Sequence, residues 1–203
     1  MKKNIYQGKF IVFEGLDGSG LSTQAKLLKE YLENRGIKTV LTKEPTKNSS
    51  IASKIHQALS HQIEIDSLQL QKLFAQDRRE HLENLIIPSL KEGKFVISDR
   101  YFFSSFAFGS EKEEDLEKII ELNKDFLMPD LVLLLKVRPK VCIERIKKRG
   151  EEIKLFEKEE KLEKVWKNYQ KLVDIFDVIK VIDGEQEIDK VQREVVGIVD
   201  KMI

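Results

Sequence analysis

A short apolar segment that leads directly into a glycine-rich loop is the feature that most restricts what this chain can fold into. Residues 10–14 read Phe-Ile-Val-Phe-Glu, a β-rich run without a turn residue, and the next six residues contain three glycines. From Ser22 the apolar side chains recur at helical spacing as far as Gly36, a residue type that commonly ends helices. The pattern predicts a buried strand, a loop and an amphipathic helix in direct succession.

The rest of the chain repeats this alternation of apolar strands and helices. Further strands are expected at residues 38–43, 95–99, 131–137 and 178–182, and further helices at 50–59, 66–90, 111–126, 139–149, after 160 as far as 176, and 188–203. Continuous apolar strands separated by helices are typical of a parallel sheet covered on both faces. We therefore expect one α/β domain over residues 1–203, with three layers and a five-stranded parallel sheet. The mostly charged run 151–160 predicts a short mobile lid at about 145–160.

The composition excludes several classes of protein. Lys and Arg number 36 and Asp and Glu number 35, so the net charge of +1 gives no general attraction for nucleic acid polymers or anionic membranes. No uncharged apolar run approaches the roughly 20 residues of a membrane span. The single cysteine, Cys142, excludes an intramolecular disulfide, and the first residues lack the apolar stretch of a signal peptide. We expect a cytoplasmic protein that binds a small anion at a local site.

The glycine-rich loop fits a phosphate-binding motif at every defined position except one. Residues 15–22 read Gly-Leu-Asp-Gly-Ser-Gly-Leu-Ser, and the motif G-x-x-x-x-G-K-[ST] has lysine where this chain has Leu21. Successive N–H groups of such a loop bind phosphate oxygens, the helix directs its positive end toward the anion, and Ser22 would offer its hydroxyl to Mg²⁺. The fit predicts a P-loop NTPase-type fold. The alternative is a glycine-rich turn in which Ser22 caps the helix and no ligand binds.

Leu21 removes the side-chain cation that normally reaches the β- and γ-phosphates, but it leaves the backbone donors and the helix dipole in place. Loss of one preorganised charge donor typically lowers a rate by about 10²–10³-fold, unless another cation occupies the gap. Binding should therefore survive better than catalysis. The candidate replacements are Lys47, Arg100, Arg145 and Arg149.

Four segments together resemble the thymidylate kinase family. The first, residues 13–24, is similar to the family's opening motif, in which Glu precedes the loop and an acidic residue often lies inside it. Three others resemble family motifs in order and spacing: Lys-Glu-Pro at 43–45, Leu-Phe-Ala-Gln-Asp-Arg at 73–78, and Ser-Asp-Arg-Tyr at 98–101. The resemblance implies transfer of the γ-phosphoryl group of ATP to dTMP, giving dTDP, with Mg²⁺ as cofactor. It also implies a homodimer formed through helices.

The resemblance further implies a role for each candidate site residue. The residues expected to bind the donor nucleotide are Gly15, Gly18, Ser19, Gly20, Leu21, Ser22, Thr23 and Arg145. The residues expected to bind the acceptor are Asp17, Glu44, Lys47, Phe74, Arg78, Arg100, Ser105 and Phe108. The catalytic set is Asp17, Arg100 and Arg149, and the metal set is Ser22 and Asp99.

Each implied role has a physical rationale. Phe74 would stack on the thymine ring, and Arg78, one helical turn further along, would hydrogen-bond the base edge. The planar guanidinium of Arg100 suits the acceptor phosphate, Asp99 would organise Mg²⁺ or its waters, and Asp17 would contact the 3′-hydroxyl of the acceptor sugar. The alternatives are a packed Phe74, a solvated Arg78, a surface ion pair between Asp99 and Arg100, and a turn-forming Asp17.

Other implied roles concern the second strand end and the lid. Glu44 and Lys47 would lie where substrate phosphate and metal meet, and their alternative is a capped turn. Arg145 and Arg149 would close over the ATP phosphates and help to exclude water, whereas the alternative makes them solvent-facing helix residues. Bacterial members of the family often carry Tyr-Gln where this chain has Phe108-Gly109, so the substrate contacts there are expected to differ from theirs.

Two further functions stay open besides an active thymidylate kinase. A nucleotide-binding protein of the same fold, with weak or lost phosphoryl transfer, is favoured by Leu21. Another nucleoside or nucleoside-monophosphate kinase would differ in whether the pocket around Phe74 and Arg78 accepts thymine in preference to uracil, cytosine or a purine.

Overall fold

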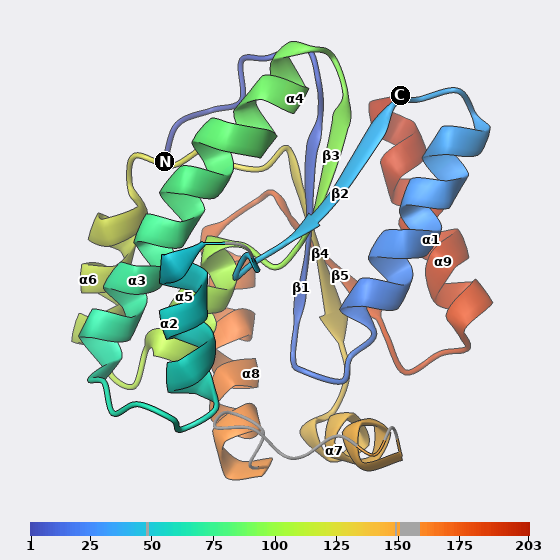
Figure 1. Ribbon diagram of the computed structural model, residues 1–203. Helices are drawn as coiled ribbons and strands as arrows, with labels where there is room; N and C mark the ends of the chain where they lie inside the picture. Colours follow the sequence, from blue (N-terminus) through green and yellow to red (C-terminus); the bar gives the residue numbers. More distant parts are fainter. Residues whose placement is uncertain (48, 149, 151–158) are drawn as a thin grey trace.

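The computed structural model describes residues 1–47, 49–148, 150 and 159–203, and these form a five-stranded parallel sheet between two layers of helices (Figure 1). The strands are β1 (Phe10–Gly15), β2 (Thr39–Lys43), β3 (Phe95–Asp99), β4 (Leu131–Lys136) and β5 (Ile179–Asp183). Their spatial order is β2-β3-β1-β4-β5, with parallel pairing throughout. The predicted three-layer α/β architecture is confirmed. All five strands therefore end at one edge of the sheet, where ligands bind in open parallel sheets.

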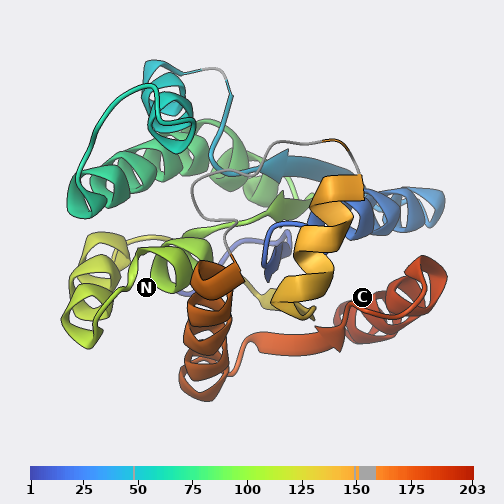
Figure 2. The same ribbon diagram turned by 90° about the horizontal axis from the view of Figure 1, so that it is seen from below.

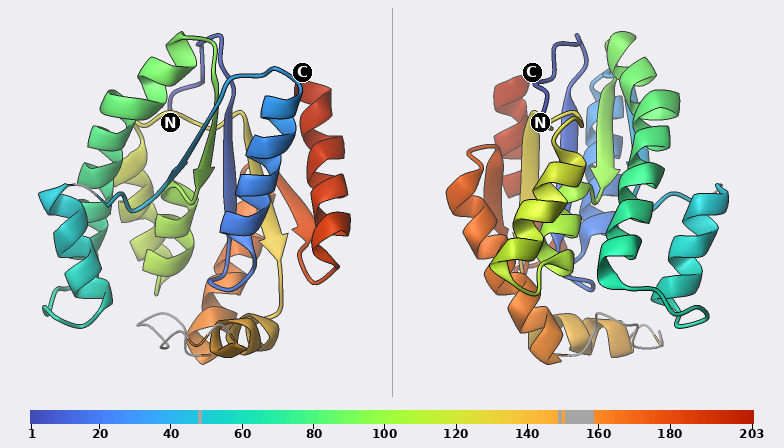
Figure 3. Two further views of the ribbon diagram at one scale, coloured as in Figure 1. Left: turned by 45° about the vertical axis from the view of Figure 1, so that its right-hand side comes forward. Right: turned by 90° about the vertical axis from the view of Figure 1, so that its left-hand side faces the viewer.

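The helices divide between the two faces of the sheet. The helices α1 (Leu21–Asn34) and α9 (Ile188–Val199) cover one face, and a larger group covers the other (Figure 3). That group comprises α3 (Ser67–His81), α4 (Ile87–Lys91), α5 (Phe102–Gly109), α6 (Glu113–Asn123) and α8 (Glu159–Ile175). The short α2 (Ser50–Leu59) packs on α3, and α7 (Pro139–Lys148) lies beyond the carboxyl edge of the sheet, opposite both termini (Figures 1 and 2).

The strand sequences explain why both faces are covered. In β1, Phe10 and Val12 belong to the apolar core on the larger helical side, whereas Ile11 and Phe13 belong to the core shared with α1 and α9. All four are fully buried. Because alternate side chains of a strand point to opposite faces, a continuous apolar run needs helices on both sides.

The main departure from the predicted elements lies between residues 66 and 90, where one helix was expected. The structure has α3, then a π-helical turn at Leu82–Ile86, then α4. Pro88 explains the interruption, because it has no N–H to donate to the carbonyl of Asn84 and its ring crowds that carbonyl. A wider turn relieves the conflict, as is common for π-helical segments inside longer helices.

Other differences are smaller. The sequence analysis predicted no helix at Phe102–Gly109, where the structure has α5, and it extended α6 to Phe126 although the helix ends at Asn123. The closing helix ends at Val199 and continues as a 3₁₀ turn over Asp200–Met202. Most of the predicted lid, residues 151–158, lies outside the described residues. Among the residues that are described, no helix is long and apolar enough to cross a membrane.

Candidate active site

The loop that joins β1 to α1 is shaped by glycines and leaves the start of α1 uncapped. Gly18 and Gly20 have φ values of +84° and +101°, which other residues rarely adopt. A Cβ atom on Gly18 would lie 2.6 Å from the carbonyl oxygen of Cys142, so the loop packs directly against α7. Gly20 is the N-cap of α1 and offers no side-chain acceptor, which leaves the first N–H groups of the helix for an anion.

Two side chains approach the carboxylate of Asp99 at the end of β3. The hydroxyl of Ser22 donates to Oδ2 of Asp99, and Nζ of Lys43 lies 2.9 Å from the same oxygen. The register between β2 and β3 places Lys43 directly opposite Asp99. The second oxygen, Oδ1, is buried and has no hydrogen-bond partner within the described part of the chain. An unpartnered carboxylate oxygen beside a serine hydroxyl is a donor set that suits Mg²⁺.

Arg100 follows β3 and reaches over the glycine-rich loop. Its φ of +76° is unusual for a residue with a side chain, and such strain often occurs at functional sites. The guanidinium donates to the carbonyl oxygen of Gly15 at 2.8 Å, to Oγ of Ser104 at 2.9 Å and to Oδ1 of Asp17 at 2.9 Å. Its carbon lies 5.3 Å from the ring centre of Phe108. The structure thus brings the predicted Asp17 and Arg100 together, with the guanidinium fixed in direction.

Glu14, at the end of β1, organises the segment that carries Arg100. Its Oε1 accepts from the backbone N–H groups of Tyr101 and Ser104, at 2.9 and 3.1 Å, at the start of α5. Its Oε2 accepts from the hydroxyls of Ser104 and Tyr169, at 2.6 and 2.8 Å. Burial raises the pKa of Glu14 above its ordinary value, although nearby Arg100 and these hydrogen bonds oppose the shift. Glu14 therefore fixes the turn from β3 into α5.

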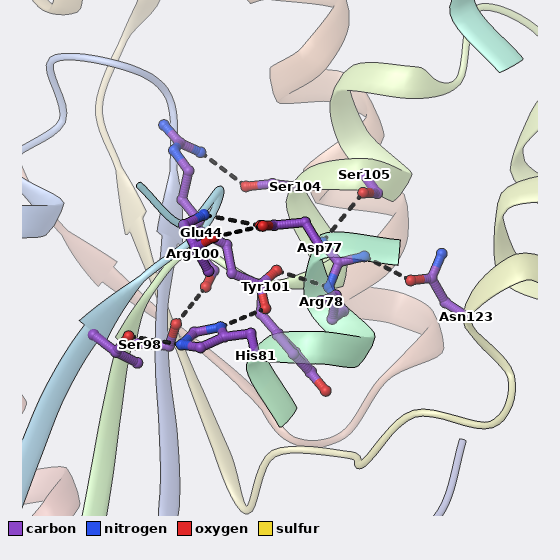
Figure 4. Close-up of polar contacts among 12 residues, drawn as sticks. Glu44, Asp77, Arg78, His81, Ser98, Arg100, Tyr101, Ser104, Ser105 and Asn123 are labelled. Atoms are coloured by element: carbon purple, nitrogen blue, oxygen red, sulfur yellow. Dashed lines mark hydrogen bonds and ion pairs between the residues drawn. The ribbon is translucent and has the colours of Figure 1, made fainter. Parts of the chain in front are cut away.

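Behind the cavity, a buried polar network joins β2 to α3 (Figure 4). The side chain of Arg78 is 2% exposed and donates from Nε to Glu44 at 2.7 Å and from Nη1 to Oδ1 of Asn123 at 2.7 Å. A longer contact of 3.4 Å joins Nη2 to Oγ of Ser105. The other oxygen of Glu44 lies 3.1 Å from Nδ1 of His81. Arg78 is therefore not the solvated helix residue of the alternative interpretation.

One cavity of about 440 Å³ at the carboxyl edge of the sheet is lined by residues of the glycine-rich loop, the end of β3 and part of the polar network. The lining includes most of the predicted residues: Asp17, Gly18, Gly20, Leu21, Ser22, Thr23, Glu44, Phe74, Arg78, Asp99, Arg100, Ser105 and Phe108. Gly15 and Ser19 belong to the same loop, and Oγ of Ser19 is another buried atom for which the described residues provide no partner. Because Asp99 is 3% exposed and Arg100 pairs with Asp17, the alternative of a surface Asp99–Arg100 pair is wrong.

Two further predicted residues, Arg145 and Lys47, are not part of this lining. Arg145 donates from both terminal nitrogens to the carbonyl oxygen of Gly184 at 3.1 Å, and from one of them to that of Ser19 at 3.5 Å. It is thus half-buried beside the loop and is not freely solvated. Lys47 is exposed. Arg149 lies outside the described residues.

Sequence reasoning did not select Lys43, Glu14 or His81 as site residues. Glu14 had a visible signal, because it is a charged residue at the end of an otherwise apolar strand. Lys43 also had a visible signal in the sequence, since it ends a strand that neighbours the strand of Asp99 in this fold. By contrast, Asn123 lies 45 residues from the Arg78 that it contacts, and no local sequence pattern predicts that pairing.

Comparison with known proteins gives a consistent result. The profile of a family described as thymidylate kinase matches residues 13–195. A probable thymidylate kinase from Thermococcus kodakarensis is 40% identical over 96% of this chain and 98% of the relative. A thymidylate kinase from Desulfotalea psychrophila is 39% identical over 97% and 96%. Among solved structures, thymidylate kinase from Candida albicans superposes with a TM-score of 0.82 at 25% identity, covering 98% of this chain and 93% of that one.

Proposed function

The chain belongs to the thymidylate kinase family, and on that premise we propose that its cavity transfers the γ-phosphoryl group of ATP to dTMP, giving dTDP and ADP, with Mg²⁺ as cofactor. The observation that carries the proposal is that the uncapped start of α1, the carboxylate of Asp99 and the guanidinium of Arg100 meet at one cavity. A helix N-terminus and a fixed arginine are two anion-binding groups, as a reaction between two phosphorylated molecules requires.

Ser22 and Asp99 are the residues that would hold the metal ion. Oδ1 of Asp99 is buried without a partner, and the hydroxyl of Ser22 lies beside Oδ2. Within the described chain there is no cluster of three or more His, Cys, Asp or Glu side chains, which agrees with a metal bound by few protein oxygens together with substrate phosphates. When bound, Mg²⁺ would neutralise charge that develops on the transferred group.

Protein groups on each side of the reacting atoms would position the substrates. The N–H groups of residues 18–22 would bind the phosphates of ATP, and Arg145 would add a cation beside Ser19. Arg100 would hold the acceptor phosphate so that its oxygen attacks the γ-phosphorus as the bond to the ADP oxygen breaks. Such transfer depends chiefly on positioning and electrostatic stabilisation, so the fixed direction of Arg100 matters directly.

The acceptor nucleoside would occupy the part of the cavity lined by Phe74 and Arg78. Phe74 would stack on thymine, and Ser105 and Phe108 would line the pocket. A guanidinium has five N–H groups, and the contacts of Arg78 to Glu44, Asn123 and Ser105 engage three of them. Arg78 can therefore keep its structural contacts and still donate to a carbonyl oxygen of the base. Asp17 would contact the 3′-hydroxyl of the sugar.

Leu21 favours a second candidate, a nucleotide-binding protein with weak or lost transfer. We take Leu21 to replace the lysine of the phosphate loop. Its side chain is 6% exposed and packs in the core shared by α1 and α9. The backbone donors of the loop do not depend on this side chain, so binding of ATP is expected to persist even if transfer is slow.

A coupled assay of ADP release separates these functions. The unaltered chain and Leu21→Lys are each given ATP and Mg²⁺ with dTMP, dUMP, CMP or AMP. A thymidylate kinase gives turnover that depends on dTMP, and preference for another acceptor would indicate a different nucleoside-monophosphate kinase. Activity in Leu21→Lys alone would identify the second candidate. Absence of turnover in both chains with every acceptor would contradict the proposal.

The proposal also includes a homodimer and the two remaining cations. The resemblance implies assembly through helices, and light scattering of the purified chain should then give twice the mass of one chain. Lys47 would assist acceptor binding, and Arg149 would act with Arg145 over the phosphates. Charge removal at either position should raise KM or lower kcat in the same assay.

A further inference from the structure

The position of Leu21 leaves the phosphate loop without its usual cation, and the cavity contains a lysine that the loop motif does not include. We propose that Lys43, at the end of β2, supplies the missing positive charge by binding the β- or γ-phosphate of ATP. This inference rests on the proposed function, because it assigns a residue to the donor phosphates of that reaction.

The contacts of Lys43 place it next to the gap. Its Nζ lies 2.9 Å from Oδ2 of Asp99, and the same oxygen accepts from the hydroxyl of Ser22. Ser22 follows Leu21 in the first turn of α1. The shared carboxylate oxygen of Asp99 therefore links the ammonium of Lys43 to that turn. Lys43 and Leu21 both line the cavity. Lys43 therefore borders from β2 the same cavity that Leu21 borders from α1.

Lys43 also has the freedom to move onto a phosphate. Its side chain is 49% exposed, whereas that of Asp99 is 5% exposed. Because water reaches the ammonium of Lys43, solvent weakens its pairing with Asp99, and the ammonium can exchange a carboxylate oxygen for a phosphate oxygen. A flexible four-carbon stem that ends in three N–H donors can make this exchange without movement of the strand.

The other cations near the cavity are already committed. Arg100 donates to Gly15, Ser104 and Asp17, and Arg78 is buried against Glu44 and Asn123.

Arg145 is bonded to two backbone carbonyls, and Lys47 is exposed outside the cavity lining. Of the lysine and arginine residues that the structure describes in the lining, Lys43 has the fewest contacts to lose. Lys43 is therefore the cation best able to leave its present partner and bind a phosphate of ATP.

A double-mutant cycle tests the assignment. Lys43→Met is made in the unaltered chain and in Leu21→Lys, and kcat is measured with saturating ATP and dTMP. In the unaltered chain kcat should fall by about 10²–10³-fold, as for loss of one preorganised charge donor. In Leu21→Lys the fall should be at least tenfold smaller, because the loop lysine then supplies the charge. Lys43→Arg should retain part of the activity.

A binding measurement provides a readout that does not depend on turnover. Calorimetry without metal should show that Lys43→Met weakens ATP binding about tenfold or more, as expected for a charge-assisted hydrogen bond. Lys38→Met, an exposed lysine that precedes the same strand, is the matched control and should change neither binding nor kcat. Thermal unfolding verifies that each variant is folded, and Lys43→Gln replaces Lys43→Met if the latter is not.

The outcomes separate this inference from the proposed function. Equal losses in both backgrounds, or no loss in either, would overturn the role of Lys43 and leave the kinase assignment standing. Activity that requires Leu21→Lys would also overturn the role of Lys43, and it would identify the second candidate, a nucleotide-binding protein with weak or lost transfer. Absence of turnover in both the unaltered chain and Leu21→Lys would instead contradict the function itself.

Discussion

The two sides of the cavity differ in how their buried polar groups are satisfied. On the network side, defined by Glu44, Arg78 and His81, the polar side chains are bonded to one another. On the loop side, defined by residues 15–22 and Asp99, Oγ of Ser19 and Oδ1 of Asp99 are buried without a partner in the described chain, and α1 has no side-chain cap.

Buried polar groups in folded proteins are normally paired, so the difference is informative. The network side is completed by the fold itself and should resemble a rigid part of the core. We expect the loop side to be completed by the phosphates and the metal ion of the proposed reaction. Changes on the network side should therefore act mainly on stability, and side-chain changes on the loop side should act mainly on ligand binding and rate.

The largest effect on stability is expected from Arg78→Met. This change leaves Glu44 and Asn123 buried without their partner, and removal of one member of a buried ion pair typically costs about 3–5 kcal/mol. Urea unfolding at pH 7 measures it. The matched control is Arg79→Met, because Arg79 is the exposed neighbour on α3 and should change stability by less than about 1 kcal/mol. Similar small losses for both variants would show that the network side is not rigid.

The second prediction concerns the backbone of the loop side. Gly18→Ala should lower the free energy of unfolding by about 2–4 kcal/mol, because it adds left-handed strain and a Cβ atom 2.6 Å from a carbonyl oxygen. Gly20→Ala adds strain but has open space, so it should cost only about 1–2 kcal/mol. Equal losses in urea unfolding would mean that packing against α7 does not hold the loop.

A third, smaller effect depends on pH and concerns Glu14, which directly precedes the glycine-rich loop. Its pKa is raised by burial, so the folded state binds more protons than the unfolded state above the ordinary value of 4.5. The contribution of Glu14 to stability is therefore present at low pH and is lost as pH rises through the raised pKa. Relative to Glu14→Gln, the unaltered chain should lose stability between pH 4.5 and pH 7. If the stability of the unaltered chain relative to Glu14→Gln stays constant or increases over this pH range, the raised pKa of Glu14 is contradicted.

The smallest effect is expected from an exposed ionic cluster that links α1 to the carboxyl terminus. Arg35 contacts Asp200 at 2.7 Å and the hydroxyl of Tyr31 at 2.8 Å, and both charged residues are exposed. Arg35→Met should lower stability by about 0–1 kcal/mol, since solvent screens such pairs. If Arg35→Met lowers stability as much as Arg78→Met does, burial does not explain the difference between the exposed cluster and the buried network.

The sequence predicted the sheet because its strands are unusually clear. Residues 10–13 and 131–135 are continuous apolar runs, and the glycine-rich loop fixes the order of strand, loop and helix. The helix α5 was missed because its eight residues are mostly aromatic and small, without a polar face. It is buried almost throughout, and burial on all sides removes the periodicity by which a surface helix is recognised.

The site was predictable where its residues belong to motifs. Asp17, Asp99 and Arg100 were found in this way, and the structure places all three at one cavity. The pair that fixes the segment after Arg100, Glu14 and Tyr169, was not found, because 155 residues separate these two in the sequence. Long-range pairings of this kind arise from the packing of helices on the sheet, which a local pattern does not encode.

The most direct test of the account is direct detection of the product made by the unaltered chain. ATP, Mg²⁺ and dTMP are incubated with the protein, and the nucleotides are separated and quantified by chromatography. The account predicts dTDP and ADP in equal amounts, and neither product when dTMP is omitted. Hydrolysis of ATP to ADP without dTDP, or unchanged dTMP in both the unaltered chain and Leu21→Lys, would contradict it.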